Sequence, residues 1–330
     1  MTKIYVIRHA EAEGNIYRRF HGQYESGVTA NGRRQIEALS RRFRDIPVDA
    51  CYTSDLIRTQ ITAGAVYRQK NLPLQLEPAF REIYVGRWEN VSFGWLYTYE
   101  LEDMMRFDSA PEDWWVEGGE TFQTSTDRFL HALNKVAEKH DGQTVCVFTH
   151  AAIIRCVMRR LFPGAKIGHS DNTAVTLLEY EAGSFRPVYF NDNSHLTEEI
   201  STLAKQTWWR ENEAERVLDR NLWFREEAPD GEEVRFTAFF EQTPMGKLWI
   251  RDVDDDTGEV VYMELDPVFR GGGLAVQLLG QAVFHFRDAG KTKLLIRAAE
   301  ESQPVQSLCK SQGMCLREDG YFELDLRLRP

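Results

Sequence analysis

The feature that most constrains the fold is a repeated junction at which a short apolar run passes directly into a helical pattern. The run "QTVCVFTH" (143–150) is almost uninterrupted, and an amphipathic pattern follows it at once over 151–162. The runs "KIYVIR" (3–8) and "VDACYTS" (48–54) are of the same kind. Apolar runs without alternation are typical of strands that are buried on both faces. They predict an α/β fold with a mainly parallel sheet and helices on both of its faces.

Helical periodicity supplies the layers on either side of this sheet. The expected helices cover residues 29–45, 55–69, 124–140 and 151–162, and Thr29 is suited to cap the first of them. Two strand patterns between residues 173 and 192 then predict a closing hairpin.

The composition of the sequence and the order of its strand and helix patterns change near residue 200. We expect the charged, tryptophan-rich stretch 201–227 to be helical, and three strand patterns follow it between residues 233 and 266. The chain then continues with a glycine cluster, a helix over 274–289, a strand, a short helix and a last strand. These patterns predict two domains, residues 1–200 and 201–330, the second with a mixed, largely antiparallel sheet.

Composition limits the classes of function. The 330 residues carry a formal net charge of −11, which disfavours nucleic acid as a partner because no basic excess is available to neutralise phosphates. No apolar run approaches the roughly 20 residues that span a bilayer and no signal-peptide pattern is present, so we expect a cytoplasmic protein without a membrane partner. The five cysteines show no paired spacing, which argues against a disulfide framework or a structural zinc site.

Polar residues stand at the ends of the predicted strands. Arg8 and His9 end the first strand, Arg58 lies one turn into the helix after the second, and His150 ends the late apolar strand. Because functional groups gather beyond the carboxyl ends of such strands, we expect these residues to meet in one crevice, joined by Glu82 from a loop. Each residue alone also fits an ordinary solvated or ion-paired position, so the hypothesis depends on the joint pattern.

The joint pattern is suited to phosphoryl transfer. Two guanidinium groups and an imidazole form a clamp for a tetrahedral dianion, since arginine binds phosphate oxygens bidentately. A histidine held against that clamp can attack phosphorus through an unprotonated nitrogen. A nearby carboxylic acid can protonate the leaving oxygen and later activate water. This chemistry needs no metal, and the sequence shows no aspartate cluster that would hold one.

Several motifs in register resemble a known family. They are "IRHAEAEGN", "TSDLIRTQ", "FREIYVGRWEN", "EGGET" and "VFTHAAIIR", and they resemble the histidine phosphatase superfamily in its phosphoglycerate-mutase-like branch over about residues 1–195. The resemblance implies a phosphohistidine intermediate with His9 as the nucleophile and Glu82 as the proton donor. It also implies that the phosphate pocket is formed by Arg8, Arg58 and His150.

The same resemblance implies roles for the segment that follows His9. Asn15 matches an asparagine near the phosphate, and Gly22 matches the glycine of a substrate loop. Glu25 stands where the family usually has an aspartate, which leaves the substrate open beyond a small phosphorylated metabolite. The aromatic insert between residues 89 and 118 is either a helical lid over the pocket or a packing face. A phosphatase is favoured over a mutase because the long basic substrate loops of the family's mutases are not evident.

The glycine cluster of the second half resembles a second family. Glycines before a helix let backbone N–H groups approach a pyrophosphate. The stretch "RGGGLA" fits the R-x-x-G-x-A loop of GNAT acetyltransferases, and the likeness covers roughly residues 205–330. The resemblance implies acetyl-CoA as the cofactor, bound by a loop made of Arg270, Gly271, Gly272, Gly273, Leu274 and Ala275.

Departures from the GNAT pattern leave two alternatives for this half. Cys309 stands where the family usually has a tyrosine that protonates the departing thiolate, and Met314 and Ser302 replace a phenylalanine and an asparagine. The chain is then either a bifunctional phosphatase and N-acetyltransferase with an unknown acceptor, or a phosphatase with a degenerate second module. Such a module would bind acyl-CoA without transfer, or would mediate a homodimer.

Overall fold

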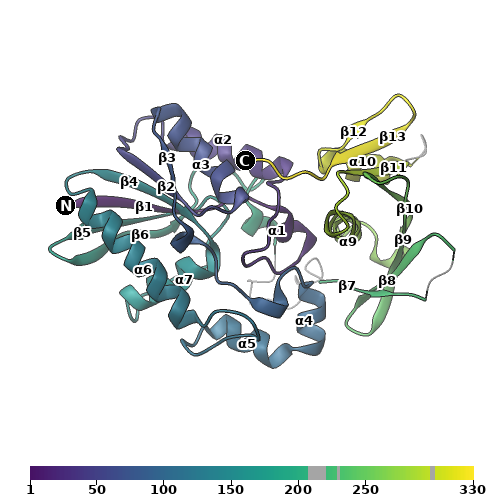
Figure 1. Ribbon diagram of the computed structural model, residues 1–330, viewed down its shortest axis with the longest axis horizontal. Helices are drawn as coiled ribbons and strands as arrows, with labels where there is room; N and C mark the ends of the chain where they lie inside the picture. The colour runs from purple at the N-terminus through teal and green to yellow at the C-terminus, as the bar shows by residue number, and fades with distance from the viewer. Residues whose placement is uncertain (207–220, 229–230, 298–301) are drawn as a thin grey trace.

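The computed structural model describes residues 1–206, 221–228, 231–297 and 302–330, which form two α/β units, each built on its own sheet (Figure 1). The first sheet has the strand order β3-β2-β4-β1-β5-β6. Its strands are β1 (Thr2–Arg8), β2 (Ala50–Thr53), β3 (Leu74–Leu76), β4 (Thr144–Thr149), β5 (Val175–Glu181) and β6 (Ser184–Asp192). Strands β1 to β4 are parallel and β5 and β6 are an antiparallel hairpin, which confirms the predicted mainly parallel sheet.

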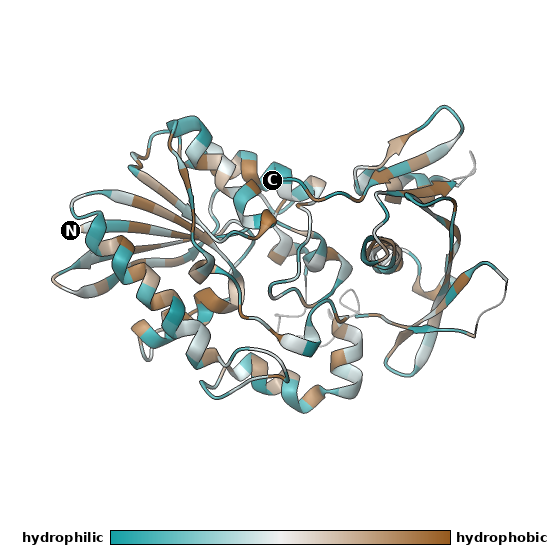
Figure 2. Cartoon of the chain, viewed as in Figure 1, coloured by the Kyte–Doolittle hydropathy of each residue, from teal (hydrophilic) through white to brown (hydrophobic). Residues whose placement is uncertain are grey.

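Both faces of this sheet are buried under helices, which explains the uninterrupted apolar runs. The helices of the first unit are α1 (Glu13–Tyr17), α2 (Ala30–Arg42), α3 (Ile57–Lys70), α4 (Phe93–Tyr99), α5 (Leu101–Ser109), α6 (Phe122–Lys139) and α7 (Ala151–Leu161). On β1, Ile4 and Val6 belong to one core cluster with residues of α6 and α7, whereas Ile7 belongs to another with residues of α2 and α3. Figure 2 shows the resulting apolar colouring of the central strands. Thr29 caps α2 as predicted, because its side chain accepts a hydrogen bond from the Gly32 N–H.

The second unit contains a seven-stranded sheet in the order β12-β13-β11-β10-β9-β8-β7. Its strands are β7 (Trp223–Glu226), β8 (Val234–Phe240), β9 (Thr243–Asp252), β10 (Thr257–Leu265), β11 (Lys293–Arg297), β12 (Cys315–Leu316) and β13 (Tyr321–Asp325). Only the β10–β11 pair is parallel, which confirms the mixed, largely antiparallel sheet. Helices α9 (Ala275–Asp288) and α10 (Gln303–Ser311) accompany it, whereas α8 (Thr202–Lys205) binds Glu11 and Asp171 of the first unit. No described helix is long and apolar enough to cross a membrane.

The prediction of one helix over 201–227 is wrong at the C-terminal end of this stretch, where the chain forms a strand. The described part of this stretch contains the short helix α8 and, at residues 223–226, strand β7; residues 207–220 lie outside the described part of the chain. The physical reason is aromatic pairing across the sheet, because the Trp223 ring stacks on Phe239 of β8 with 4.5 Å between ring centroids.

The two units meet where α9 crosses α1. In Figure 1, α9 is seen end-on between α1 and the second sheet. A Cβ atom at Gly280 of α9 would lie only 2.4 Å from the ring of Tyr17 of α1, so the close crossing requires a glycine at this position. Tyr17 therefore packs in the core of the second unit although it belongs to the first.

Candidate active site

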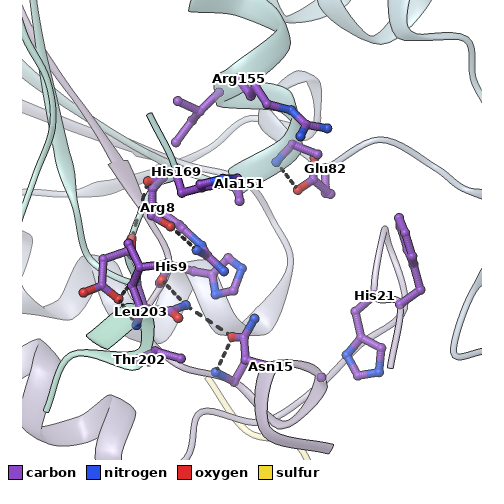
Figure 3. Close-up of a pocket in the computed structure, with 18 of the residues that line it drawn as sticks. Arg8, His9, Asn15, His21, Glu82, Ala151, Arg155, His169, Thr202 and Leu203 are labelled. Carbon is purple, nitrogen blue, oxygen red and sulfur yellow. Dashed lines mark hydrogen bonds between the residues drawn. The ribbon is translucent and has the colours of Figure 1, made fainter. Parts of the chain in front are cut away.

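The carboxyl ends of β1 and β4 border a pocket with a volume of about 230 Å³. Its lining includes five of the predicted residues, namely Arg8, His9, Asn15, Arg58 and Glu82. Figure 3 shows Arg8, His9, Asn15 and Glu82 around the same space. The strands and helices thus bring together side chains that are up to 74 positions apart in the sequence.

His9 is held in the state that a nucleophile requires. Its Nδ1–H donates to the backbone oxygen of Ala10 over 2.8 Å, which leaves the lone pair on Nε2. Burial lowers the pKa of His9 well below its ordinary value, and the nearby guanidinium groups of Arg58 and Arg8 lower it further. The imidazole is therefore neutral at neutral pH, and it is only 7% exposed.

Two buried arginines supply positive charge beside His9. Arg58, which is 1% exposed, donates to the backbone oxygens of Gly22 and Tyr24 over 2.6 and 2.9 Å. Arg8 donates to the backbone oxygen of Ser170, and its Nε–H has no hydrogen-bond partner among the described residues. Burial lowers the pKa of both guanidinium groups, which is the electrostatic cost of holding two cations in one pocket.

Gly22 acts on the site through its backbone. It does not line the pocket, and its carbonyl oxygen is one of the two acceptors that orient Arg58. A Cβ atom here would lie 2.4 Å from Glu89 Oε1. Glu25 supports the same arginine from the other side, because its carboxylate accepts from the Ile57 N–H at the start of α3 over 3.0 Å. Glu25, which stands where the family usually has an aspartate, therefore binds the N-terminus of α3, the helix that carries Arg58.

His150 lies beneath the pocket and outside its lining. It is fully buried, and its ring centroid is 5.3 Å from that of His9. Its Nε2 shares a hydrogen bond with Ser54 Oγ over 3.0 Å, while Nδ1 has no partner in the part of the chain that the structure describes. Burial, followed by the charge of Arg58, lowers the pKa of His150 well below its ordinary value.

Glu82 lies at the N-terminus of α7. Its Oε1 accepts from the Ile153 N–H over 2.8 Å, and its Oε2 accepts from the Ala152 N–H over 2.9 Å. The carboxyl group is 7% exposed and lines the pocket. By contrast, Glu11 accepts hydrogen bonds from Thr29, Asn31 and Thr202 and does not line the pocket, so its role is structural.

Asn15 is oriented by its amide oxygen. This oxygen accepts from the Ala12 N–H over 3.0 Å and from Asn172 Nδ2 over 3.2 Å, so the amide nitrogen remains for the pocket. Asn172 also donates to the backbone oxygen of His9 over 3.0 Å. The sequence reasoning missed Asn172, although it stands in a segment that resembles the family.

Buried polar atoms without a partner in the protein are concentrated here. They include Arg8 Nε, Ser26 Oγ, His150 Nδ1, Arg155 Nε and Asn172 Oδ1. Buried polar groups are nearly always hydrogen-bonded. Their concentration at or beside one pocket indicates a site for a polar ligand with several hydrogen-bonding oxygens.

The aromatic insert is both a packing face and a pocket wall. Trp114 and Leu96 are fully buried in the core of the first unit. Phe93, Tyr97 and Phe107 line the pocket, together with Met104 and Asp108. Sequence reasoning also missed five basic residues of the wall, because their neighbours in space come from distant segments; they are Arg18, Arg19, His21, Arg155 and His169.

The glycine loop of the second unit precedes α9. Gly271 and Gly273 have φ values of +84° and +73°, and nothing lies within 4 Å of a Cβ atom built on either residue. Leu274 precedes α9 without a side-chain cap, so the first N–H groups of the helix are not capped by a side chain. The Arg270 guanidinium, however, turns back to the end of β10, where it donates to Leu265 O and Glu264.

Cys309 is enclosed by the core of the second unit. It is 0% exposed, and burial raises the pKa of its thiol to about 11. Its position on α10 thus offers no exposed acid at the place where the family pattern has a tyrosine. Among the described residues, no group of three or more histidine, cysteine, aspartate or glutamate side chains is arranged to hold a metal ion.

A neutral buried histidine between two arginines, at the carboxyl edge of an α/β sheet, defines a phosphoryl-transfer site. Residues 4–193 match the family model described as the histidine phosphatase superfamily (branch 1), and the chain belongs to this superfamily. Residues 197–314 match the acetyltransferase (GNAT) family, so the protein is a histidine phosphatase fused to a GNAT domain.

Similar proteins carry phosphatase and mutase names. A metal-independent phosphoserine phosphatase from Arabidopsis thaliana is 30% identical over 201 residues, which cover 60% of this chain and 84% of that protein. A probable phosphoglycerate mutase, GpmB, from Cronobacter sakazakii is 28% identical over 158 residues, or 48% of this chain and 74% of that one. The solved structure of Bacillus stearothermophilus YhfR superposes with a TM-score of 0.56 at 28% identity, covering 59% of this chain and 99% of that one.

Proposed function

We propose that the first domain hydrolyses a small phosphorylated metabolite without a metal, through a phosphohistidine on His9. The observation that carries this proposal is the neutral His9 with its Nε2 lone pair beside two buried guanidinium groups. Such an arrangement binds a phosphate dianion and presents a nucleophile to it.

The steps follow from the positions of the side chains. Nε2 of His9 attacks phosphorus and the bond from phosphorus to the ester oxygen breaks, while Arg8 and Arg58, which line the pocket, hold the phosphoryl oxygens. His150 supports this clamp from beneath the pocket, beside the ring of His9. Glu82 donates a proton to the leaving alkoxide. The Glu82 carboxylate then takes a proton from water, whose oxygen attacks phosphorus and breaks the P–N bond. His9 is regenerated and inorganic phosphate leaves.

We further propose that the substrate carries a carboxylate in addition to its phosphate. Arg155 lines the pocket from α7, donates one hydrogen bond to the Phe107 oxygen and keeps an unpartnered Nε–H. Asp108 lines the same side of the pocket from α5 and can pair with an ammonium group. Phosphoserine and phosphoglycerate, the compounds in the relatives' names, both contain a carboxylate. Phosphoserine, which also has an ammonium group, is the first substrate to test.

For the second domain we propose that the loop 270–275 binds the pyrophosphate of acetyl-CoA. The open space at Gly271 and Gly273 and the uncapped start of α9 support this assignment. The domain then acts as an N-acetyltransferase on an unknown acceptor, which makes the protein bifunctional. The enclosed Cys309 favours a water molecule or another side chain as the acid. Calorimetry with acetyl-CoA tests the loop, and an absence of binding at millimolar ligand would overturn it.

The phosphatase assignment is tested with His9→Ala and a matched control, His131→Ala, at an exposed histidine of α6. We expect His9→Ala to lose phosphate release from phosphoserine by about 10⁴-fold or more. The control and the chelator-treated wild type should keep full activity. Activity that persists in His9→Ala would overturn the assignment, and isomerisation without free phosphate would assign a mutase instead.

The carboxylate assignment is tested with Arg155→Met against Arg159→Met, one turn further along α7 and exposed. We expect Arg155→Met to raise the KM for phosphoserine about tenfold, because one charged hydrogen-bond pair is lost. The KM for p-nitrophenyl phosphate, which has no carboxylate, should not change. Equal effects on the two substrates would reject the carboxylate site but not the phosphatase.

A further inference from the structure

One cation of the pocket wall lacks a carboxylate partner. Arg19 lines the pocket and donates to the backbone oxygen of Asn90 and to the side-chain oxygen of Gln281. Within the described part of the chain, no carboxylate lies within ion-pair distance of it. Burial lowers the pKa of Arg19 to about 10, so the group stays charged at neutral pH. The carboxylate of Asp288 acts on Arg19 only from beyond ion-pair distance. An anion bound in the pocket that Arg19 lines would therefore be a direct partner for this buried cation.

Gln281, the acceptor that orients Arg19, belongs to α9 of the second domain. Phe284, one turn further along α9 and 1% exposed, contacts the same wall. The Arg19 Cζ atom lies 5.0 Å from the centroid of the Phe284 ring. The His21 ring meets that ring edge-on with 5.2 Å between centroids. One turn of α9 therefore contacts two side chains that line the phosphatase pocket, Arg19 and His21.

Polar contacts fix α9 against the segment that carries these residues. Arg287 donates to both carboxylate oxygens of Glu13 over 2.7 and 2.9 Å, and the two side chains are only 13% and 14% exposed. Tyr24 donates its hydroxyl hydrogen to Asp288. The backbone oxygen of the same Tyr24 is one of the two acceptors that orient Arg58. Helix α9 thus supports both the pocket wall and the loop that holds the phosphate clamp.

We propose that α9 of the acetyltransferase-like domain is part of the phosphatase site, and that Gln281 is a positioning residue that holds Arg19 toward the anionic substrate. The inference rests on the proposed function, because it assigns a role in substrate binding to a helix of the other domain. Arg19 touches the substrate, whereas Gln281 acts through Arg19. Loss of the Gln281 acceptor lets the guanidinium leave its orientation, which weakens binding of the substrate more than it slows the chemical step.

The test uses the full chain and three variants. Gln281→Ala removes the acceptor, and Gln281→Glu gives Arg19 a carboxylate that pairs with its charge. Gln312→Ala is the control, because Gln312 follows the last residue of α10 and its amide donates to the neighbouring Ser311. Steady-state hydrolysis of phosphoserine gives KM and kcat for each. We expect Gln281→Ala to raise KM about five- to tenfold with kcat within a factor of two. Gln281→Glu should raise KM at least as much, because its carboxylate competes with the substrate for Arg19, and Gln312→Ala should match the wild type.

The outcomes separate this inference from the proposed function. A wild type that releases no phosphate from phosphoserine or p-nitrophenyl phosphate refutes the function. If the wild type hydrolyses only p-nitrophenyl phosphate, the carboxylate assignment fails, and the same comparison of variants is made with that substrate. An active wild type and a folded Gln281→Ala with unchanged KM overturn the positioning role and leave the function standing. A KM that rises in Gln281→Ala but is unchanged in Gln281→Glu also overturns it, because the charge of Arg19 then does not act on the substrate.

Discussion

The two proposed ligand sites of this chain are built in different ways. The phosphatase pocket is formed by side chains from several segments, among them a neutral buried histidine and several polar atoms without a partner in the protein. The loop 270–275 presents mainly backbone, and its one long side chain, Arg270, is bound to the end of β10. The first site therefore specifies a chemistry, whereas the second specifies only the shape and charge of a ligand.

The contrast teaches how much each kind of site depends on single residues. Removing one catalytic side chain from the pocket should affect the rate by orders of magnitude. When one glycine of a backbone loop is replaced, ligand binding should weaken only by the free-energy cost of holding the new residue at the same φ and ψ. The predictions below test this difference, and they run from the largest expected effect to the smallest.

Replacing Glu82 with glutamine should lower kcat for phosphoserine by about 10²- to 10⁴-fold, the usual contribution of general acid–base catalysis. The physical reason is that an amide cannot protonate an alkoxide or deprotonate water. The loss should be smaller for p-nitrophenyl phosphate, whose leaving group needs less protonation. Glu37→Gln is the control, because Glu37 is an exposed residue of α2 and does not line the pocket. Equal losses for the two substrates would argue against Glu82 as the acid.

Acid should destabilise the first domain more than the second. Burial lowers the pKa of His9, His21 and His150 well below the ordinary value, so below about pH 6.5 the unfolded chain binds protons that the folded chain does not. Stability therefore falls as the pH falls through this range. The raised pKa values of Glu25 and Glu89 act in the opposite direction.

Burial also lowers the pKa of His169 and His195 and raises the pKa of Asp108. With these five histidines against three carboxyl groups, we expect a net loss of stability of at least about 1 kcal/mol between pH 7.5 and pH 5.5. Hydrogen exchange, corrected for the intrinsic rate, measures it separately in peptides from β1 and β4 and in peptides from β10 and β11. The second domain contains a single histidine, His285, and should change less. A larger loss in β10 and β11 than in β1 and β4 would reverse the comparison.

Gly273→Ala should weaken acetyl-CoA binding about fivefold, because an alanine at a φ of +73° costs on the order of 1 kcal/mol. Gly290→Ala is the matched control, since Gly290 has a φ of +80°, lies in the same domain and is equally open. Calorimetry gives both dissociation constants. An equal loss in the two variants would assign the effect to the stability of the domain and not to the loop.

Much of the fold could be predicted from the sequence because each strand carries its own signal. The apolar runs predicted β1, β2 and β4, and the order of motifs predicted which strand ends bear Arg8, His9 and His150. Strand β7 was not predicted, because its four residues follow a charged stretch and gain their conformation from pairing with β8. The two-residue strand β12 was missed for the same reason.

The remaining parts of the site depend on contacts between segments distant in sequence. Arg155 ends a motif that resembles the family, yet its place in the pocket depends on the insert that supplies Phe107. Arg19 and His21 gain their surroundings from α9, about 260 residues later in the chain. No local pattern of charge or hydropathy can predict a contact between segments that are so far apart in the sequence.

The ion pair between Glu13 and Arg287 has a consequence for the synthesis of the protein. The two residues are 274 positions apart. At a translation rate of roughly 5–20 residues per second, α1 leaves the ribosome on the order of tens of seconds before its partner helix exists. During this interval Glu13 and the ring of Tyr17 lack their contacts with α9 and are open to solvent. The wall of the phosphatase pocket that contacts α9 is therefore completed only after the C-terminal part of the chain has been synthesised.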